Sequence, residues 1–320
     1  MHATEQEART AVSQGPVARA VGRLPPTSFF LTSAVFHYLG PSLAVLLFAH
    51  VAALGVAWLR IASAAVVFAA WRRPWRIFAG TSHRQRLVFL ALGLVLAAMN
   101  SLFYLAIARV PLATVGAIEF LGTVILAAAG ARTRRNVLAL VLAVGGVAVL
   151  TSVSLAGQPL GLAFAFANCA GFMIYVVLGH RIANSTGDAS RPLSGIDQLG
   201  LAMLIAAVAA TPLGIVPAAR AFTHPAWLCW GIGVGVSSSV IPYVTDQLAM
   251  ARLPRATFSL MLALLPAAAT VIGLLVLRQV PTLRDLAGIA LVILGVAVHR
   301  DTRSGTAAPS ATALPYSGER

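Results

Sequence analysis

The chain has 320 residues, of which 59% are hydrophobic and only 10% are charged, and its mean hydropathy is +0.87. A soluble domain cannot bury that much apolar surface, whereas a bilayer accepts it, because each spanning helix needs about 20 mostly apolar residues. The net charge of +14 comes from Arg alone, without any Lys, and the Arg residues lie between apolar stretches, which indicates membrane orientation and not nucleic-acid binding.

Apolar stretches bounded by Arg, Pro or Gly predict an all-α membrane protein of about ten transmembrane helices. Each stretch is long enough to cross the hydrocarbon with its backbone hydrogen-bonded internally. In chain order, the helices are expected at 28–48, 51–71, 86–108, 111–131, 136–153, 159–180, 196–217, 226–248, 255–277 and 283–299.

Both ends of the chain are polar. Residues 1–27 lack the apolar core and the small-residue cleavage site of a signal peptide, so they are expected to form a cytoplasmic N-terminal tail. Residues 300–320 are rich in Ser, Thr, Ala, Pro and Gly and are expected to form a disordered cytoplasmic tail.

The positions of the 23 Arg residues predict the orientation. With the N-terminus inside, 18 of them fall in inner segments, Arg60 lies within a span, and 4 fall outside, namely Arg109, Arg220, Arg278 and Arg284. This excess predicts a multi-pass protein of the cytoplasmic membrane with both termini in the cytoplasm.

An internal repeat predicts the architecture. Residues 105–114 return 143 positions later as residues 248–257, with seven of ten identical, and the Gly-Val-Ala-Val of 146–149 returns at 295–298. A five-helix unit duplicated in tandem must invert, because an odd number of spans ends on the opposite face. The prediction is two inverted repeats, 28–153 and 159–299, which are typical of transporters with a substrate site at the repeat interface.

Three polar residues share a level near the middle of the membrane. Glu119 lies roughly 12 Å and Arg60 roughly 14 Å from the outer ends of their spans at the helical rise, and Asn100 lies at a similar depth. In a functional interpretation, Arg60 binds a substrate carboxylate, and Glu119 binds a substrate ammonium group or exchanges a proton. The alternative is that Arg60 and Glu119 form a buried ion pair that joins two helices.

Other polar residues have two interpretations each. Tyr38, Asn168 and Tyr175 are candidates for lining a cavity, although hydrogen bonds between helices are the commoner role of such residues. His37 precedes a helix-kinking Gly40-Pro41 step, where freed carbonyls would suit a cavity, but a packing kink with His37 bonded to a neighbour is the favoured interpretation.

The eighth predicted span carries two further features. Ser237, Ser238 and Ser239 precede Pro242, a pattern that fits either close helix packing or a gate. Asp246, near the cytoplasmic end of the span, is a candidate for proton coupling, with pairing at the membrane interface as the alternative.

No catalytic or metal-binding pattern is present in the sequence. Cys169 and Cys229 stand singly in apolar stretches, and there is no His-Glu-x-x-His, no Gly-x-Ser-x-Gly and no phosphate-binding loop. We therefore expect no cofactor and no enzyme activity, and transport driven by a proton gradient or by exchange.

Several motifs resemble those of EamA-type members of the drug/metabolite transporter superfamily, and in particular the threonine/homoserine exporter branch. The resemblance covers roughly residues 30–299. It lies in Leu59-Arg60, Met99-Asn100-x-x-Phe103-Tyr104-Leu105, Val110-Pro111-Leu112, Ile118-Glu119-Phe120, Ile174-Tyr175, Ser239-x-x-Pro242-Tyr243 and Arg252-Leu253-Pro254-x-x-Thr257-Phe258.

The resemblance implies an inverted-repeat carrier that exports amino acids or related metabolites, with proton exchange. It implies roles at the site for Arg60, Asn100, Tyr104 and Glu119, which match family motif positions, and Asp246 stands where the branch has Glu. Two family acids are replaced, by Leu265 before the ninth-span proline and by Gln279 at the end of that span.

The sequence therefore favours a secondary active exporter of amino acids, threonine- or homoserine-like, or of related small metabolites. The expected partners are the small-molecule substrate, protons and the lipid bilayer, with a second copy of the chain as a further candidate. A drug or toxin efflux carrier is the alternative transport function, and a membrane-embedded enzyme or a lipid-handling scaffold is the alternative from another class.

Overall fold

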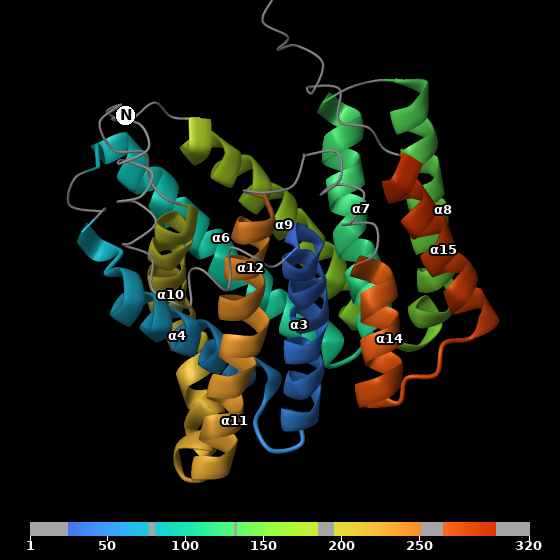
Figure 1. Ribbon diagram of the computed structural model, residues 1–320. Coiled ribbons are helices and arrows are strands. Elements are labelled where there is room, and N and C mark those ends of the chain that lie inside the picture. The colour runs from blue at the N-terminus through green and yellow to red at the C-terminus, as the bar shows by residue number, and fades with distance from the viewer. Residues whose placement is uncertain (1–24, 77–80, 131–132, 185–194, 251–264, 299–320) are drawn as a thin grey trace, which may run out of the picture.

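The computed structural model describes residues 25–76, 81–130, 133–184, 195–250 and 265–298, and these form helices and no strand (Figure 1). The helices are α3 (Pro26–Leu47), α4 (Ala53–Arg72), α6 (His83–Ile107), α7 (Leu112–Gly130), α8 (Arg134–Gly157), α9 (Pro159–Asn184), α10 (Gly195–Phe222), α11 (Pro225–Gly235), the π-helix η1 (Val236–Val240), α12 (Ile241–Met250), α14 (Leu265–Leu277) and α15 (Leu283–Val298). Since α11, η1 and α12 continue one another, the described residues contain ten helices.

The helices confirm the predicted spans. Their ends lie within a few residues of the predicted ones, and six of them are long and apolar enough by composition to cross a membrane. Of the ninth predicted span only Leu265–Leu277 is described. Residues 251–257 of the internal repeat, most of the predicted N-terminal tail and the whole predicted C-terminal tail lie outside the described residues, so the tails and the repeat boundaries stay predictions.

Local signals set several helix boundaries. α6 begins with a capping box, in which the Ser82 hydroxyl accepts from the backbone N–H of Gln85 and the Gln85 side chain accepts from the N–H of Ser82. Thr282 and Asp285 form the same arrangement at the start of α15. α4 ends at Arg73, which adopts the left-handed conformation at φ 50°.

The helices of the two predicted repeats pack mainly on each other. α4 packs on α10, α7 on α14, and α8 on α15, while α6 packs on α9 and α3 on α12 (Figure 1). In chain order, α3, α4, α6, α7 and α8 correspond to α9, α10, the α11–α12 helix, α14 and α15. When corresponding helices are exchanged, the pairs α4–α10, α7–α14 and α8–α15 stay the same, and the pair α6–α9 becomes the pair α12–α3. The contacts therefore have the two-fold pattern of paired repeats, and neither half has a core of its own.

Small residues let several of these pairs approach closely. At Gly146 of α8 an added Cβ would lie 2.6 Å from the backbone oxygen of Gly288 in α15, and at Gly55 of α4 it would lie 2.6 Å from the backbone of Pro217 in α10. Contacts this close are available only to glycine, as is common between membrane helices.

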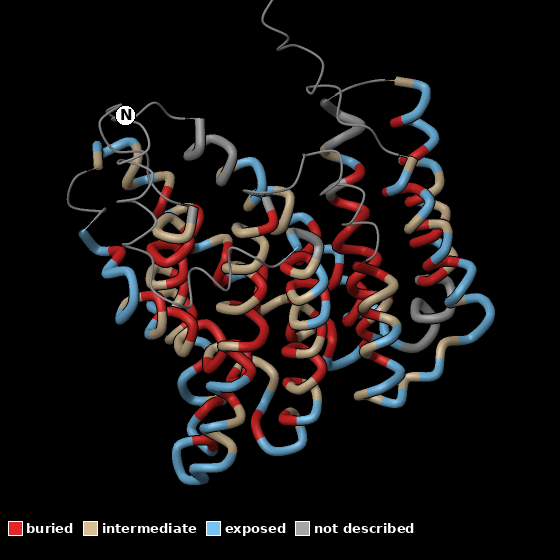
Figure 2. Tube along the Cα trace, viewed as in Figure 1, coloured by how far each residue is buried: buried red, intermediate tan, exposed pale blue. Residues whose placement is uncertain are grey.

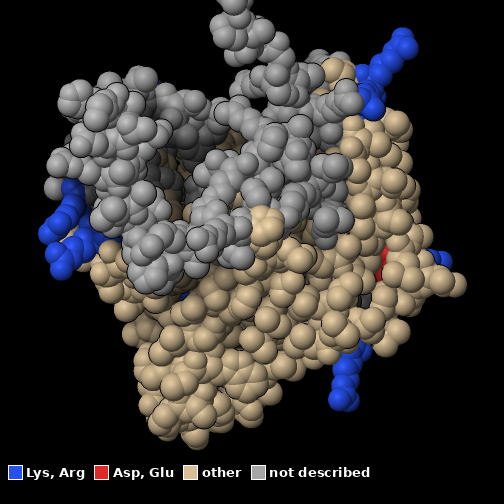
Figure 3. Space-filling view, viewed as in Figure 1, with Lys and Arg blue, Asp and Glu red and all other residues tan. Residues whose placement is uncertain are grey.

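The outer surface of the bundle is apolar. Large aliphatic side chains such as Val66, Val208, Val216 and Leu275 are more than half exposed, while the buried residues face the middle of the bundle (Figure 2). Charged side chains on the face drawn in Figure 3 lie near the two ends of the helices. This distribution suits a protein whose flank contacts lipid.

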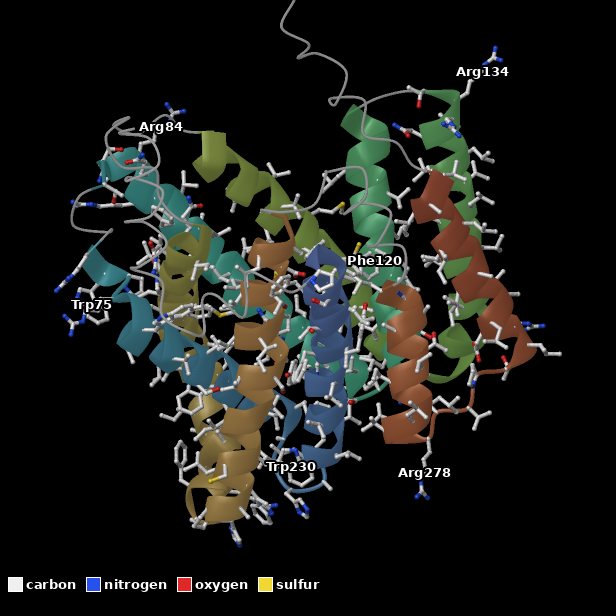
Figure 4. All side chains as sticks on the ribbon, in the orientation of Figure 1. Trp75, Arg84, Phe120, Arg134, Trp230 and Arg278 are labelled. Atoms are coloured by element: carbon white, nitrogen blue, oxygen red, sulfur yellow. The ribbon has the colours of Figure 1, made fainter. Side chains whose placement is uncertain are left out.

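Labelled side chains mark the two ends of the bundle. Arg84 and Arg134 lie at one end, called the Arg84 end below, and Arg278 and Trp230 lie at the other, called the Arg278 end (Figure 4). Arg84 and Arg134, predicted to lie inside, are therefore at the opposite end of the bundle from Arg278, predicted to lie outside.

Candidate functional site

Arg60 is the centre of a buried polar cluster between the two halves. Its side chain, on α4, is only 6% exposed. Nε donates to the Ser239 hydroxyl at 2.9 Å, Nη1 donates to Oδ1 of Asn100 at 2.5 Å, and Nη2 donates to the Ser238 carbonyl oxygen at 3.2 Å. All three acceptors are neutral, so the charge of the guanidinium group is solvated but not neutralised by them.

The local structure of η1 supplies two of these acceptors. Pro242 has no N–H, so the carbonyl of Ser238, four residues earlier, cannot make its normal α-helical bond. The N–H of Ile241, the residue before Pro242, donates to the carbonyl of Val236 five residues earlier, which is the wider spacing of a π-helix. A π-helical turn interrupts a helix at a cost and is frequent at functional sites. Here it leaves the Ser238 carbonyl free to accept from Arg60.

Two glycines bring η1 close to its neighbours. A Cβ at Gly40 of α3 would lie 2.3 Å from Cβ of Ser238, and a Cβ at Gly235 would lie 2.7 Å from the backbone oxygen of Arg60. Neither position can carry a side chain without moving a helix. The three helices α3, α4 and η1 therefore meet at the level of Arg60.

Residues of α6 complete the surroundings of Arg60. Asn100, which is 3% exposed, accepts from Arg60 and donates to the Leu96 carbonyl at 2.7 Å, so both ends of its amide are used. The ring of Tyr104 lies 5.4 Å from the guanidinium carbon, within the range of a cation–π interaction. The Tyr104 hydroxyl is buried and makes no well-formed hydrogen bond.

Glu119 lies on α7 and is 8% exposed. Its charge interacts with that of Arg60, but the two side chains do not form an ion pair within 4.0 Å. The alternative of a buried ion pair between them is therefore not realised, because Arg60 is bound by α6 and η1 instead.

A second set of polar groups surrounds Glu119. The hydroxyl of Tyr38 lies 3.1 Å from the position of a Cβ on Gly116, one turn before Glu119 on the same face of α7. The amide of Asn168, on α9, lies beside the Glu119 carboxyl group. The Tyr38 hydroxyl and both polar atoms of the Asn168 amide are buried without a well-formed hydrogen bond.

In the described part of the chain, Tyr175 and Asp246 make no hydrogen bond or ion pair with Arg60. Tyr175 stacks on Phe172 with the ring centroids 6.2 Å apart, and it interacts electrostatically with Tyr243 and Asp246. Asp246 is half-buried on α12, beside Ser33 of α3. Tyr243 interacts electrostatically with both Arg60 and Asp246. Arg252, the expected interfacial partner of Asp246, lies outside the described residues.

The two positions that depart from the family pattern have structural roles. Leu265 is buried at the start of α14. Gln279 accepts a hydrogen bond from the backbone N–H of Leu112 at 3.2 Å and so caps the N-terminus of α7 from the end of α14. Beside it lies a pocket of about 60 Å³ at the Arg278 end, with Thr114 and Thr270 among its lining residues.

The sequence alone did not reveal the role of η1. The serines were interpreted as a packing surface or a gate, yet Ser238 and Ser239 bind Arg60 directly. The signal that points to this is Pro242, four residues after Ser238, because a proline at that spacing frees the carbonyl. Among the described residues no group of three or more His, Cys, Asp or Glu could hold a metal ion.

Comparisons with known proteins agree with this architecture. The EamA-like transporter family matches residues 159–299. The threonine/homoserine exporter RhtA of Salmonella typhimurium is 35% identical over 249 residues, which are 76% of this chain and 80% of that protein. RhtA of Escherichia coli is 34% identical over 260 residues, 79% of this chain and 84% of that protein.

A solved structure is similar in fold. The crystal structure of this other protein has a TM-score of 0.52 to the present chain, and its sequence is 17% identical. The match covers 85% of this chain and 95% of the other. Because the identity is low, this similarity concerns the fold alone.

Proposed function

Because the chain belongs to the EamA-like transporter family, we propose that it exports zwitterionic amino acids, with threonine and homoserine as the first candidates, and that protons drive the export. The chain is a transporter and not an enzyme. Its close relatives carry the name threonine/homoserine exporter, which supports these two amino acids as the first substrates to test.

The observation that carries the proposal is the state of Arg60. A charged guanidinium group that is almost fully buried normally has an anionic partner, because removing an unpaired charge from water is costly. Within the described ranges of the chain, the acceptors of Arg60 are Asn100, Ser239 and the Ser238 carbonyl. A guanidinium group has five N–H donors, so donors remain for the carboxylate of a substrate.

Glu119 is suited to the other end of the same substrate. It lies in the same buried region without an ion pair to Arg60, and the ammonium group of an amino acid would neutralise it. In this pose the substrate carboxylate faces α4 and the ammonium faces α7. A cationic drug fits less well, because the buried positive charge of Arg60 would repel it.

Glu119 is also the proposed site of proton exchange. A carboxyl group in a medium of low dielectric constant is stable when protonated, so a proton and a substrate ammonium group can replace each other there. Asp246, nearer the predicted inner face, is a second acid on the path from the cytoplasm. This part of the proposal rests on the burial of Glu119, on the partial burial of Asp246, and on Glu119 having no cationic side chain of the described residues within 4.0 Å.

Arg60 also connects substrate binding with movement of the two halves. It belongs to the first half and bonds to η1 of the second. A substrate carboxylate bound to the remaining N–H donors of Arg60 would draw the guanidinium group away from the Ser239 hydroxyl and the Ser238 carbonyl and so loosen this connection. The halves could then rock about the site, with the Arg84 end facing the cytoplasm, as the excess of Arg there favours.

The test is exchange of labelled L-threonine by protein reconstituted in liposomes, with and without a pH gradient. Wild-type protein should exchange threonine, the gradient should stimulate the flux, and Glu119→Gln should lose this stimulation. Asp197→Asn is the matched control, since Asp197 is a helix-borne acid outside the site. Normal coupled flux in Glu119→Gln would contradict its role, and no exchange of any amino acid by folded wild type would contradict the substrate class.

A further inference from the structure

Asn168 is a buried polar side chain that the proposed transport cycle does not yet use. It lies in the middle of α9 and is 1% exposed. Its amide nitrogen faces the Glu119 carboxyl group without reaching ordinary hydrogen-bond geometry, and its amide oxygen has no hydrogen-bond partner in the described part of the chain. Buried amides are nearly always paired, so an amide with both ends unpaired needs an explanation.

Asn100 shows what a structural asparagine looks like in this bundle. Its oxygen accepts from Arg60 and its nitrogen donates to the Leu96 carbonyl, so it joins α6 to α4 and satisfies both of its polar ends. Asn168 makes no bond of this quality: its nitrogen only approaches Glu119 and its oxygen is left without a partner. A role as a hydrogen-bonding link between helices, which is the usual role of asparagine in a membrane, therefore does not account for it.

The surroundings of Asn168 place it at the substrate site. Gly122 of α7 lets α9 approach so closely that an added Cβ would lie 2.9 Å from Sγ of Cys169, the residue after Asn168. Gly122 is one turn after Glu119, as Gly116 is one turn before it. Glu119 is thus flanked along α7 by the region of Asn168 on one side and by the Tyr38 hydroxyl on the other.

The chemistry of these unpaired groups indicates what they bind. The amide of Asn168 offers two N–H donors and a carbonyl acceptor, and the Tyr38 hydroxyl both donates and accepts. An ammonium group is only a donor, and a carboxylate is only an acceptor, so neither matches both ends of the amide. A hydroxyl group does, because it donates one hydrogen bond and accepts others.

We propose that Asn168 is the specificity-determining residue that recognises the side-chain hydroxyl of a small amino acid bound between Arg60 and Glu119. The inference rests on the proposed function, since it concerns the same bound amino acid. Arg60 and Glu119 hold the groups that all amino acids share, and Asn168 distinguishes one side chain from another. A site built to bind a hydroxyl discriminates against an analogue that lacks it, because the analogue leaves the buried polar groups unpaired.

The test is binding of L-threonine and L-valine, which have nearly the same shape and differ in a hydroxyl against a methyl group. Dissociation constants are measured by calorimetry on purified wild-type protein, on Asn168→Leu and on Asn136→Leu. Asn136 is a buried asparagine on α8 with 1% exposure, so this control removes an amide from another part of the bundle. A melting temperature for each variant shows that it is folded.

The expected result is that wild type and Asn136→Leu prefer threonine over valine by about tenfold to hundredfold. Asn168→Leu should bind both within about threefold of each other, with its valine affinity kept or improved, because leucine replaces the amide by an apolar group of similar size. Equal binding of both amino acids by wild type would overturn this inference, but the proposed function as an amino-acid carrier would stand. An undiminished threonine preference in Asn168→Leu would overturn it too. Failure of folded wild type to bind either amino acid would refute the proposed function and this inference with it.

Where Asn168→Leu does not fold, Asn168→Asp provides the second variant. Aspartate keeps the shape and the acceptors but loses the N–H donors, and it adds a negative charge beside Glu119. The threonine preference should then fall, and a preference equal to that of wild type would contradict the role of the amide.

Discussion

Substitution of Gly235 by alanine tests whether close contact between η1 and α4 is needed to present Arg60. The new Cβ would lie 1.8 Å from the Ser63 hydroxyl oxygen and 2.7 Å from the backbone oxygen of Arg60. The Ser63 side chain can rotate away, but the Arg60 carbonyl is part of the helix backbone. To reach an ordinary contact of about 3.5 Å, the two segments must separate by about 0.8 Å.

This separation acts directly on the site. The bond from Nη2 of Arg60 to the Ser238 carbonyl is already 3.2 Å long, and a further 0.8 Å, roughly, takes it beyond hydrogen-bonding range. Overpacking of this kind costs about 1–3 kcal/mol. We expect Gly235→Ala to lower the melting temperature by about 2–10 °C and to weaken threonine binding, because the guanidinium group loses its fixed position.

Gly233→Ala is the matched control on the same helix. A Cβ at Gly233 has nothing within 4 Å, and alanine is preferred over glycine in a helix by about 1 kcal/mol, so this variant should be neutral or slightly more stable. The assay is thermal unfolding of the purified protein followed by threonine exchange in liposomes. Wild-type melting temperature and exchange in Gly235→Ala would refute the reasoning, since they would show that η1 and α4 can move apart freely.

Two further predictions concern contacts away from the site. Asp197→Asn removes the ion pair with Arg72, in which Arg72 Nε lies 2.6 Å from Asp197 Oδ1. Because this pair is partly exposed, we expect the free energy of unfolding to fall by less than about 1 kcal/mol in thermal unfolding, and threonine exchange to stay unchanged. Gly146→Ala places a Cβ 2.6 Å from the backbone oxygen of Gly288, so it should destabilise the α8–α15 pair by about 1–3 kcal/mol. A Cβ on the neighbouring Gly145 would have nothing within 4 Å, so Gly145→Ala is the tolerated control. Equal melting temperatures for the two variants would contradict this packing.

Much of the fold could be predicted from the sequence because each segment that crosses a bilayer must be an apolar helix of nearly fixed length. Length and apolarity alone identify a membrane helix, and the predicted spans agree with the helices to within a few residues. The same constraint fixes depth, since each residue advances a helix by 1.5 Å, roughly, along its axis. Arg60, Glu119 and Asn100 were therefore predicted at one level, and all three are buried in the structure.

The partners of these residues could not be predicted in the same way. The depth of a residue in the membrane does not show which helices lie side by side, or toward which neighbour a side chain points around the axis of its helix. Arg60 could equally have faced Glu119, and an ion pair was the alternative, but it bonds to Ser239, 179 residues later. Tyr175 was predicted to line a cavity and Asp246 to couple protons; in the described structure both interact electrostatically with Tyr243, and their roles stay predictions.

The sequence by itself thus determined that the chain spans a membrane, how many helices it has and at what depth its few polar residues lie, because hydropathy and helical rise are properties of each segment alone. Only the tertiary structure decided that Arg60 has neutral partners, that Pro242 frees the Ser238 carbonyl for it, and that Asn168 is buried without a hydrogen bond. These features depend on lateral packing between segments far apart in the chain, where glycines such as Gly40, Gly122 and Gly235 decide how closely two helices meet.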